Sequence, residues 1–181
     1  MPRYAPLQRI FHWLMALIIL PLAAGGVLIG ILGFQGVTDL LGGPLRDTLY
    51  EYHKTFGLIV LGLIVARLFL RMELGHPAYD PPLPLWQRLA SSLVHYLLYL
   101  ALFAMPILGW LATDASDYPV EFFHWNLPQF IAKDEAMGKA LYATHGTVGW
   151  ILVALIALHV GAALKHWLID KDGVAWRMNP F

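Results

Sequence analysis

The sequence predicts an all-α integral membrane protein, a bundle of four transmembrane helices in a single domain that covers residues 1–181. Of the 181 residues, 59% are hydrophobic and only 13% are charged, whereas about a quarter of the residues in a soluble domain are charged. Four long apolar segments divide the chain, and each exceeds the ~20 residues that cross a bilayer as a helix. The chain has no cysteine, which excludes disulfides, thiolate chemistry and iron–sulfur clusters.

The first predicted helix covers residues 7–33. Basic residues precede its apolar part, as in a secretory signal peptide, but the apolar stretch 11–33 is long enough to span a bilayer. No small-residue cleavage site follows a short apolar core. We therefore expect a helix that is retained in the protein.

The other three predicted helices cover residues 46–72, 86–113 and 135–169. The segment LGGP at 41–44 and a proline-rich segment at 76–84 separate the first three, because glycine and proline end helices. The connection 114–134 carries several aromatic residues among acids. We expect it to form an interfacial helix at the lipid headgroups; a docking surface and a lid over the outer end of the bundle are the alternatives.

Lysine and arginine are divided unequally between the two sides of this bundle. Eight lie towards the side of the termini and the second connection, and four lie towards the other side, namely Arg46, Lys54, Lys133 and Lys139. Because cytoplasmic loops of membrane proteins carry the excess of these residues, we expect both termini in the cytoplasm.

Four histidines fall at two matched depths of the predicted bundle. His53 and His145 lie near the outer ends of the second and fourth helices, and we call them the outer pair. His12 and His159 lie nearer the cytoplasmic ends of the first and fourth helices, and we call them the inner pair. Fourteen residues separate His145 from His159, which is almost four helical turns and about 21 Å, so both face the same way.

Ionisable residues inside membrane helices indicate a functional site. Two imidazoles from different helices can clamp a haem inside a helix bundle, and bis-histidine ligation suits electron transfer because the iron keeps no open position. The pattern therefore predicts two b-type haems whose iron is bound by the outer and inner pairs. Structural zinc, the main chemical alternative, usually takes four ligands in one tetrahedral cluster. A haem-free protein whose histidines only bind neighbouring helices is a further alternative.

Three basic residues are placed to serve these cofactors. Arg67 follows His53 by fourteen residues, which puts it on the same face at the level of the inner pair, and Arg9 precedes His12 by about one turn. We expect both arginines to bind propionates of the inner haem, since arginine suits carboxylates; snorkelling towards the cytoplasm is the alternative. Lys54, next to His53, is expected to serve the outer haem.

Four segments of the sequence resemble the bacterial di-haem cytochrome b561 proteins, in the order LQRIFHW, YHKTFGLIVLGLIVARLFLR, HYLLYLALFAMPILGW and THGTVGWILVALIALHVGAALKHWL. They cover all four predicted helices. The resemblance implies two b-type haems in a four-helix bundle, with axial ligation by His12, His53, His145 and His159. It also implies a quinone-linked oxidoreductase of the bacterial inner membrane. The best-defined activity in the family is oxidation of superoxide at the periplasmic face, with electrons passed to ubiquinone.

His95 matches the third helix of this family and is left over after pairing. Its level suggests contact with the inner haem or with a quinone headgroup. An exchange with His12 or His159 as ligand and a structural hydrogen-bonded histidine are the alternatives.

The function we expect is that of a membrane-bound superoxide:ubiquinone oxidoreductase, with Lys54 and His95 as catalytic residues at the superoxide and quinone ends. The outer side carries eight acids against four bases, which is a poor field for attracting an anion. The alternative is a non-catalytic cytochrome b subunit that carries electrons for a partner dehydrogenase or hydrogenase.

Overall fold

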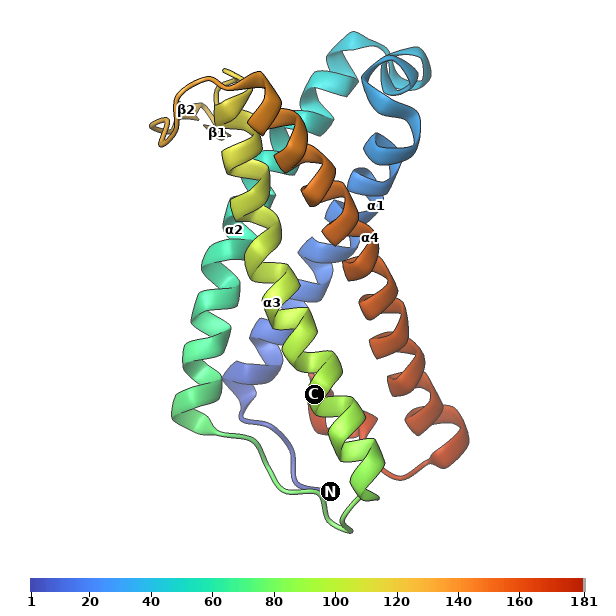
Figure 1. Cartoon of the computed structure of the whole chain (residues 1–181). Helices are drawn as coiled ribbons and strands as arrows, with labels where there is room; N and C mark the ends of the chain where they lie inside the picture. Colours follow the sequence, from blue (N-terminus) through green and yellow to red (C-terminus); the bar gives the residue numbers. More distant parts are fainter. Residues whose placement is uncertain (181) are drawn as a thin grey trace.

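Four long helices run side by side, with a small β hairpin at one end of the bundle (Figure 1). The computed structural model describes residues 1–180. The helices are α1 (Pro6–Leu41), α2 (Gly43–Leu74), α3 (Leu85–Ala115) and α4 (Glu135–Lys165). A π-helical turn, η1 (His166–Asp170), continues α4, and a 3-10 turn, η2 (Ala175–Met178), follows it. All four helices are long and apolar enough to cross a membrane, which confirms the predicted fold class.

The core of the bundle is an apolar layer about half-way along the helices. Met15 and Ile19 of α1 are buried there against Val60 and Ile64 of α2. Side chains of α3 and α4 pack on this cluster, including Tyr99, Leu102 and Ile156. In sequence, this layer lies between the levels of the inner and outer pairs, so apolar side chains separate the two groups of histidines.

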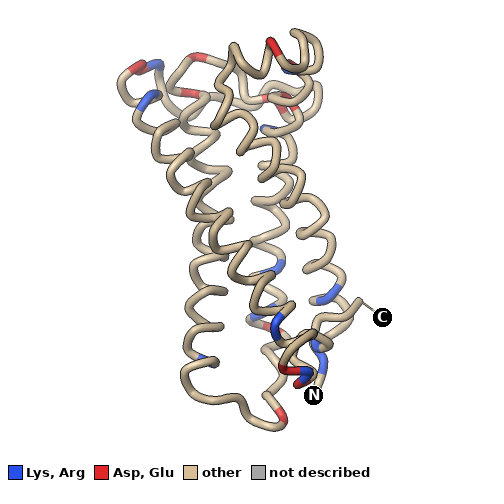
Figure 2. Tube along the Cα trace, turned by 90° about the vertical axis from the view of Figure 1, so that its right-hand side faces the viewer, with Lys and Arg blue, Asp and Glu red and all other residues tan. Residues whose placement is uncertain are grey.

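The two termini lie together at the end of the bundle opposite the hairpin (Figure 1). Arg177 of η2 is buried there, donates to the carbonyl oxygens of Pro2 and Pro77, and stacks on the ring of Tyr79 with 4.0 Å from its guanidinium carbon to the ring centroid. This cation therefore ties the C-terminal segment to the N-terminus and to the connection between α2 and α3. Figure 2 shows most charged residues near the two ends of the bundle, as a membrane-spanning centre requires.

The first three helices are longer than predicted, most clearly the first, whereas the fourth begins at the predicted residue, Glu135. We expected residues 7–33, but α1 runs to Leu41 and only Gly42 separates it from α2. Gly33 does break the helical geometry, with φ of 65°, a conformation that glycine adopts without steric cost. The helix resumes after this kink and ends at Leu41, where the carbonyl oxygen of Thr38 accepts a hydrogen bond from the N–H of Gly42 at 2.8 Å. The expected connection 41–44 is accordingly reduced to a single residue.

The expected interfacial helix in 114–134 is wrong. This segment instead forms a hairpin of β1 (Glu121–Phe122) and β2 (Trp125–Asn126), which pair antiparallel. Thr55 of α2 forms two hydrogen bonds with the backbone of this hairpin. Its hydroxyl donates to the carbonyl of Glu121 and accepts from the N–H of Phe123. Thr55 is fully buried. Its hydroxyl supplies hydrogen bonds that the backbone of 121–123 would otherwise have to form within a helix.

Candidate functional site

The structure brings the predicted histidine pairs together at two levels. The imidazole centroids of His53 and His145 lie 6.4 Å apart, and those of His12 and His159 lie 6.1 Å apart. Two imidazoles that bind one metal ion from opposite sides have centroids about 6 Å apart, because a metal–imidazole bond is about 2 Å long. Each pair therefore has the spacing of a bis-histidine site.

His145 is held in one tautomer. Its Nδ1 lies 3.0 Å from the carbonyl oxygen of Met105 on α3, and since a carbonyl only accepts, Nδ1 carries the hydrogen. The Nε2 atom of the neutral ring then keeps its lone pair for a metal. Ligand histidines are usually oriented by such a bond from the second ring nitrogen.

Buried polar atoms without partners gather at the outer level. Nδ1 of His53 and Nε1 of Trp110 are buried, and neither has a hydrogen-bond partner among residues 1–180. Buried polar groups are rarely left without a partner. The indole N–H is a donor, and Nδ1 is a donor in the tautomer that leaves the lone pair on Nε2, so both atoms call for a hydrogen-bond acceptor, such as a carboxylate of a bound cofactor.

The inner level holds a third histidine. The ring of His95 on α3 lies edge-on to that of His159, with 5.2 Å between centroids. Its Nδ1 donates to the Ser91 carbonyl oxygen at 2.6 Å, so its Nε2 also keeps a lone pair. The predicted level of His95 agrees with this position.

The two arginines predicted to bind propionates of the inner haem, Arg67 and Arg9, each have protein partners. Arg67 donates from Nε to the Tyr99 hydroxyl at 3.2 Å and from Nη1 to the Gln8 carbonyl at 3.5 Å. Arg9 donates from Nη1 to the Asn179 carbonyl at 2.8 Å. A small cavity at this end is lined by two guanidinium groups, two phenols, one amide and one thioether, those of Arg67, Arg71, Tyr4, Tyr99, Gln8 and Met178.

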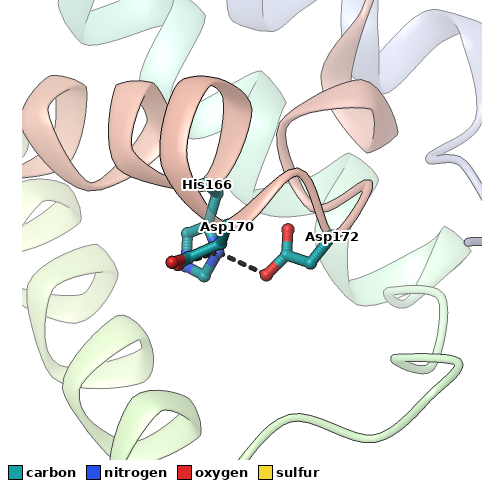
Figure 3. Close-up of side chains that lie close together, drawn as sticks. All are labelled: His166, Asp170 and Asp172. Carbon is teal, nitrogen blue, oxygen red and sulfur yellow. Dashed lines mark hydrogen bonds and ion pairs between the residues drawn. The ribbon is translucent and has the colours of Figure 1, made fainter.

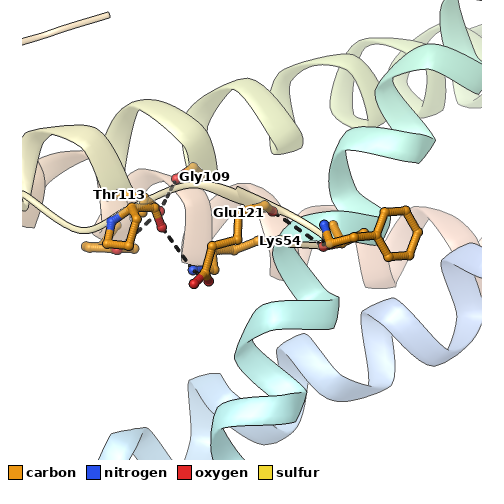
Figure 4. A network of polar contacts seen from close by, with 8 residues as sticks. Lys54, Gly109, Thr113 and Glu121 are labelled. Atoms are coloured by element: carbon orange, nitrogen blue, oxygen red, sulfur yellow. Dashed lines mark hydrogen bonds and ion pairs between the residues drawn. The ribbon is translucent and has the colours of Figure 1, made fainter. Parts of the chain in front are cut away.

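Lys54 is engaged by the hairpin. Its ammonium lies 2.7 Å from Oε2 of Glu121 and 3.0 Å from the carbonyl oxygen of Pro119 (Figure 4). Both members of this ion pair are partly exposed. Any attraction of Lys54 for an external anion therefore competes with the carboxylate of Glu121.

Comparison with known proteins adds to this geometry. A family model described as prokaryotic cytochrome b561 matches residues 3–180. The chain belongs to this family.

Relatives of this cytochrome b561 chain match over almost its whole length. It is 32% identical to cytochrome b561 homolog 1 of Escherichia coli K12, with 99% of this chain and 98% of the relative covered. It is also 32% identical to cytochrome b561 homolog 2 of the same organism, with 97% and 90% covered. A protein of Yersinia pestis named probable superoxide oxidase CybB is 25% identical, with 98% and 96% covered.

Membership of the cytochrome b561 family makes the chain a membrane electron-transfer protein and implies b-type haem. The donor set fits this group, since two imidazole pairs have the spacing of bis-histidine ligation and one imidazole has a fixed tautomer.

A four-ligand zinc site among the membrane histidines has no counterpart in the described part of this cytochrome. The group of three or more metal-type donors found in residues 1–180 is instead His166, Asp170 and Asp172 at the end of α4 (Figure 3). There the imidazole Nδ1 lies 2.6 Å from Oδ2 of Asp172, and the Lys165 ammonium lies 2.5 Å from Oδ2 of Asp170. The lysine ammonium and the imidazole already contact the two carboxylates, so this cluster forms a polar network of the protein's own side chains.

Several residues of the site were not predicted from the sequence. Gln8 is buried and its amide donates to the carbonyl of Gly75 at 3.0 Å; its position one turn before His12 was the available signal. Trp110 and Met105 contribute through their position on α3 beside α4. No local pattern indicates which backbone carbonyl an imidazole will meet, because that depends on how two helices pack.

Proposed function

We propose that this chain is a di-haem b-type cytochrome that carries electrons across the bacterial inner membrane from a periplasmic donor, superoxide, to ubiquinone. The observation that supports this most is the pair of histidine couples at two depths, with ring centroids 6.4 Å and 6.1 Å apart. Each couple joins α4 to a different helix, so one helix contributes to both sites. When bound, the two haems supply one-electron transfer between the two faces of the membrane.

The proposed task of the histidines is to hold two iron atoms with neutral imidazoles. The hydrogen bond from His145 to the Met105 carbonyl orients one ligand of the outer site. Arg67 and Arg9 are proposed to bind propionates of the inner site, where Tyr99 and Gln8 fix the guanidinium of Arg67. We place both termini in the cytoplasm, which agrees with their common end of the bundle (Figure 1) and with the excess of basic residues there.

The proposed reaction balances with these two sites. Two superoxide anions each lose one electron to become dioxygen, and ubiquinone takes two electrons and two protons to become ubiquinol. The name of the 25%-identical Yersinia pestis relative, probable superoxide oxidase, supports superoxide as the donor. His95, beside His159 and with an Nε2 lone pair to spare, is the residue we propose near the quinone headgroup.

Purified protein with ubiquinone and a superoxide-generating system tests this function. We expect ubiquinol to form with no other protein present, and to stop forming when superoxide dismutase is added. Ubiquinol that forms only when a membrane dehydrogenase or a soluble electron carrier is supplied would replace this function by that of an electron-transfer subunit.

A charge change at Lys54 is expected to alter the rate of superoxide-driven reduction. Lys54→Glu should slow it by about 5-fold or more, because one unit charge at ~4 Å in water contributes ~1 kcal/mol. Glu121→Gln should raise the rate, since it removes the carboxylate that competes for the lysine. Stopped-flow absorption at several salt concentrations measures both effects.

The matched control is Lys133→Glu, which reverses another cation that is paired with an acid, Asp117 at 3.6 Å. It should change the rate less, because Lys133 is more exposed and farther in sequence from either outer histidine. An unchanged rate and salt dependence in Lys54→Glu would remove Lys54 from the proposed donor site.

A further inference from the structure

Two glycines lie directly against the imidazoles of the outer pair. The first is Gly26 of α1. A Cβ atom at this position would lie 3.1 Å from Cε1 of His53, which is closer than ordinary van der Waals contact between carbon atoms. A glycine within a helix costs roughly 1 kcal/mol relative to alanine, and here its lack of a side chain lets the ring of His53 approach the backbone of α1.

The second glycine is Gly109 of α3. A Cβ atom there would lie 3.2 Å from Cε1 and 3.4 Å from Nδ1 of His145. Gly109 lies one turn after Met105, whose carbonyl oxygen accepts the hydrogen bond from that same Nδ1. The imidazole can reach this carbonyl because nothing projects from Gly109 into its path.

The backbone at Gly109 is itself fixed. The Thr113 hydroxyl donates to the Gly109 carbonyl at 2.7 Å, a contact drawn in Figure 4, and the Tyr142 hydroxyl of α4 donates to the same threonine oxygen at 3.5 Å. This chain of contacts links α3 and α4 one turn away from the ring of His145. The notch at Gly109 is therefore part of a braced helix contact.

This arrangement is specific to the outer pair. None of the other described glycines has a histidine among the side chains nearest to an added Cβ. Gly25 would meet Cδ1 of Leu49 at 3.2 Å, and Gly149 would meet Cε of Met105 at 3.5 Å. These two positions are similar in tightness or location but contact flexible apolar side chains.

We infer that Gly26 and Gly109 are positioning residues for the outer haem, each forming a notch that sets the orientation of one imidazole of the outer pair. Gly26 positions the ring of His53 through van der Waals contact, without a hydrogen bond at Nδ1, since Nδ1 of His53 has no hydrogen-bond partner among residues 1–180. Gly109 holds His145 by shape and by access to the Met105 carbonyl. The inference rests on the proposed ligation by the outer pair.

The effect on His145 has a defined direction. A hydrogen bond from the second ring nitrogen makes a ligand imidazole a stronger electron donor, which favours oxidised iron. Displacing the ring from the Met105 carbonyl is therefore expected to raise the reduction potential of the outer haem. Gly26→Ala is expected to alter the ring orientation of His53, which changes the electron paramagnetic resonance signal of the same haem.

Alanine and valine substitutions test this inference in the purified protein. In Gly26→Ala and Gly109→Ala, we expect the outer haem to transfer to an excess of apomyoglobin about 10- to 100-fold faster, the range typical of lost ligand-orienting contacts. Gly26→Val and Gly109→Val should lose the outer haem and keep the inner one. The retained inner haem reports that the variants are folded.

Gly25→Ala and Gly149→Ala are the controls and should keep native spectra and transfer rates. If Gly26→Val and Gly109→Val retain both haems with native potentials and resonance signals, the inference is wrong even though the proposed function stands. If the unmodified protein contains no haem that depends on His53 and His145, the proposed function itself fails. The two failures are therefore told apart by the unmodified protein.

Discussion

Replacing His145 by alanine is expected to lower the haem content of the protein from two per chain to one. The ring of His145 faces His53 at 6.4 Å and is oriented by the Met105 carbonyl, so its loss removes one of the two proposed iron ligands together with the bond that orients it. His53→Ala should have the same result, since both belong to one site. The pyridine haemochrome assay on purified protein measures the haem content.

The matched control for this prediction is His124→Ala. His124 lies exposed in the turn of the hairpin, and its loss should leave both haems in place.

Superoxide-driven reduction of the remaining haem should also be lost in His145→Ala if superoxide delivers electrons at the outer site. A His145→Ala protein with two native low-spin haems would refute ligation by the outer pair.

Replacing His159 by alanine is expected to abolish ubiquinol formation while superoxide still reduces the haem that remains. His159 faces His12 at 6.1 Å and also adjoins His95 at 5.2 Å, so it is common to both possible couples at the inner level. Its removal leaves no pair that joins α4 to another helix there. Rapid-mixing absorption measures reduction of the outer haem by superoxide, and a separate assay measures the ubiquinol formed.

His12→Ala separates the two couples at the inner level. The centroids of His95 and His159 are closer than the ~6 Å of a shared metal, so His95 would have to shift to replace His12. We expect haem loss in His12→Ala, as in His159→Ala. Retention of two low-spin haems in His12→Ala, with loss in the double variant that also lacks His95, would show that His95 is the ligand instead.

The bundle and the two histidine levels were predictable because both follow from local regularities. Apolar runs longer than the bilayer thickness predict the spans, and helical geometry places His145 and His159 on one face of α4 at two depths. The pairing with His53 and His12 then follows from the alternating direction of the helices. The ring distances of the two pairs agree with that reasoning.

The features that the sequence did not reveal depend on contacts between distant segments. The hairpin at 121–126 forms because Thr55 and Lys54 of α2 bind its backbone and Glu121, and no pattern within 114–134 signals those partners. The extension of α1 beyond Gly33 depends on a positive φ at one glycine, which leaves the following residues free to resume a helix. The notches at Gly26 and Gly109 depend on which side chain the neighbouring helix presents.

The central claim is that two histidine pairs hold two b-type haems in one four-helix bundle. A reduced-minus-oxidised absorption spectrum of the detergent-purified protein, with haem quantified per chain, tests it most directly. We predict two low-spin b-type haems per chain that titrate as separate components. A folded, membrane-inserted protein with no haem, or with a single haem that persists in both His145→Ala and His159→Ala, would contradict the claim.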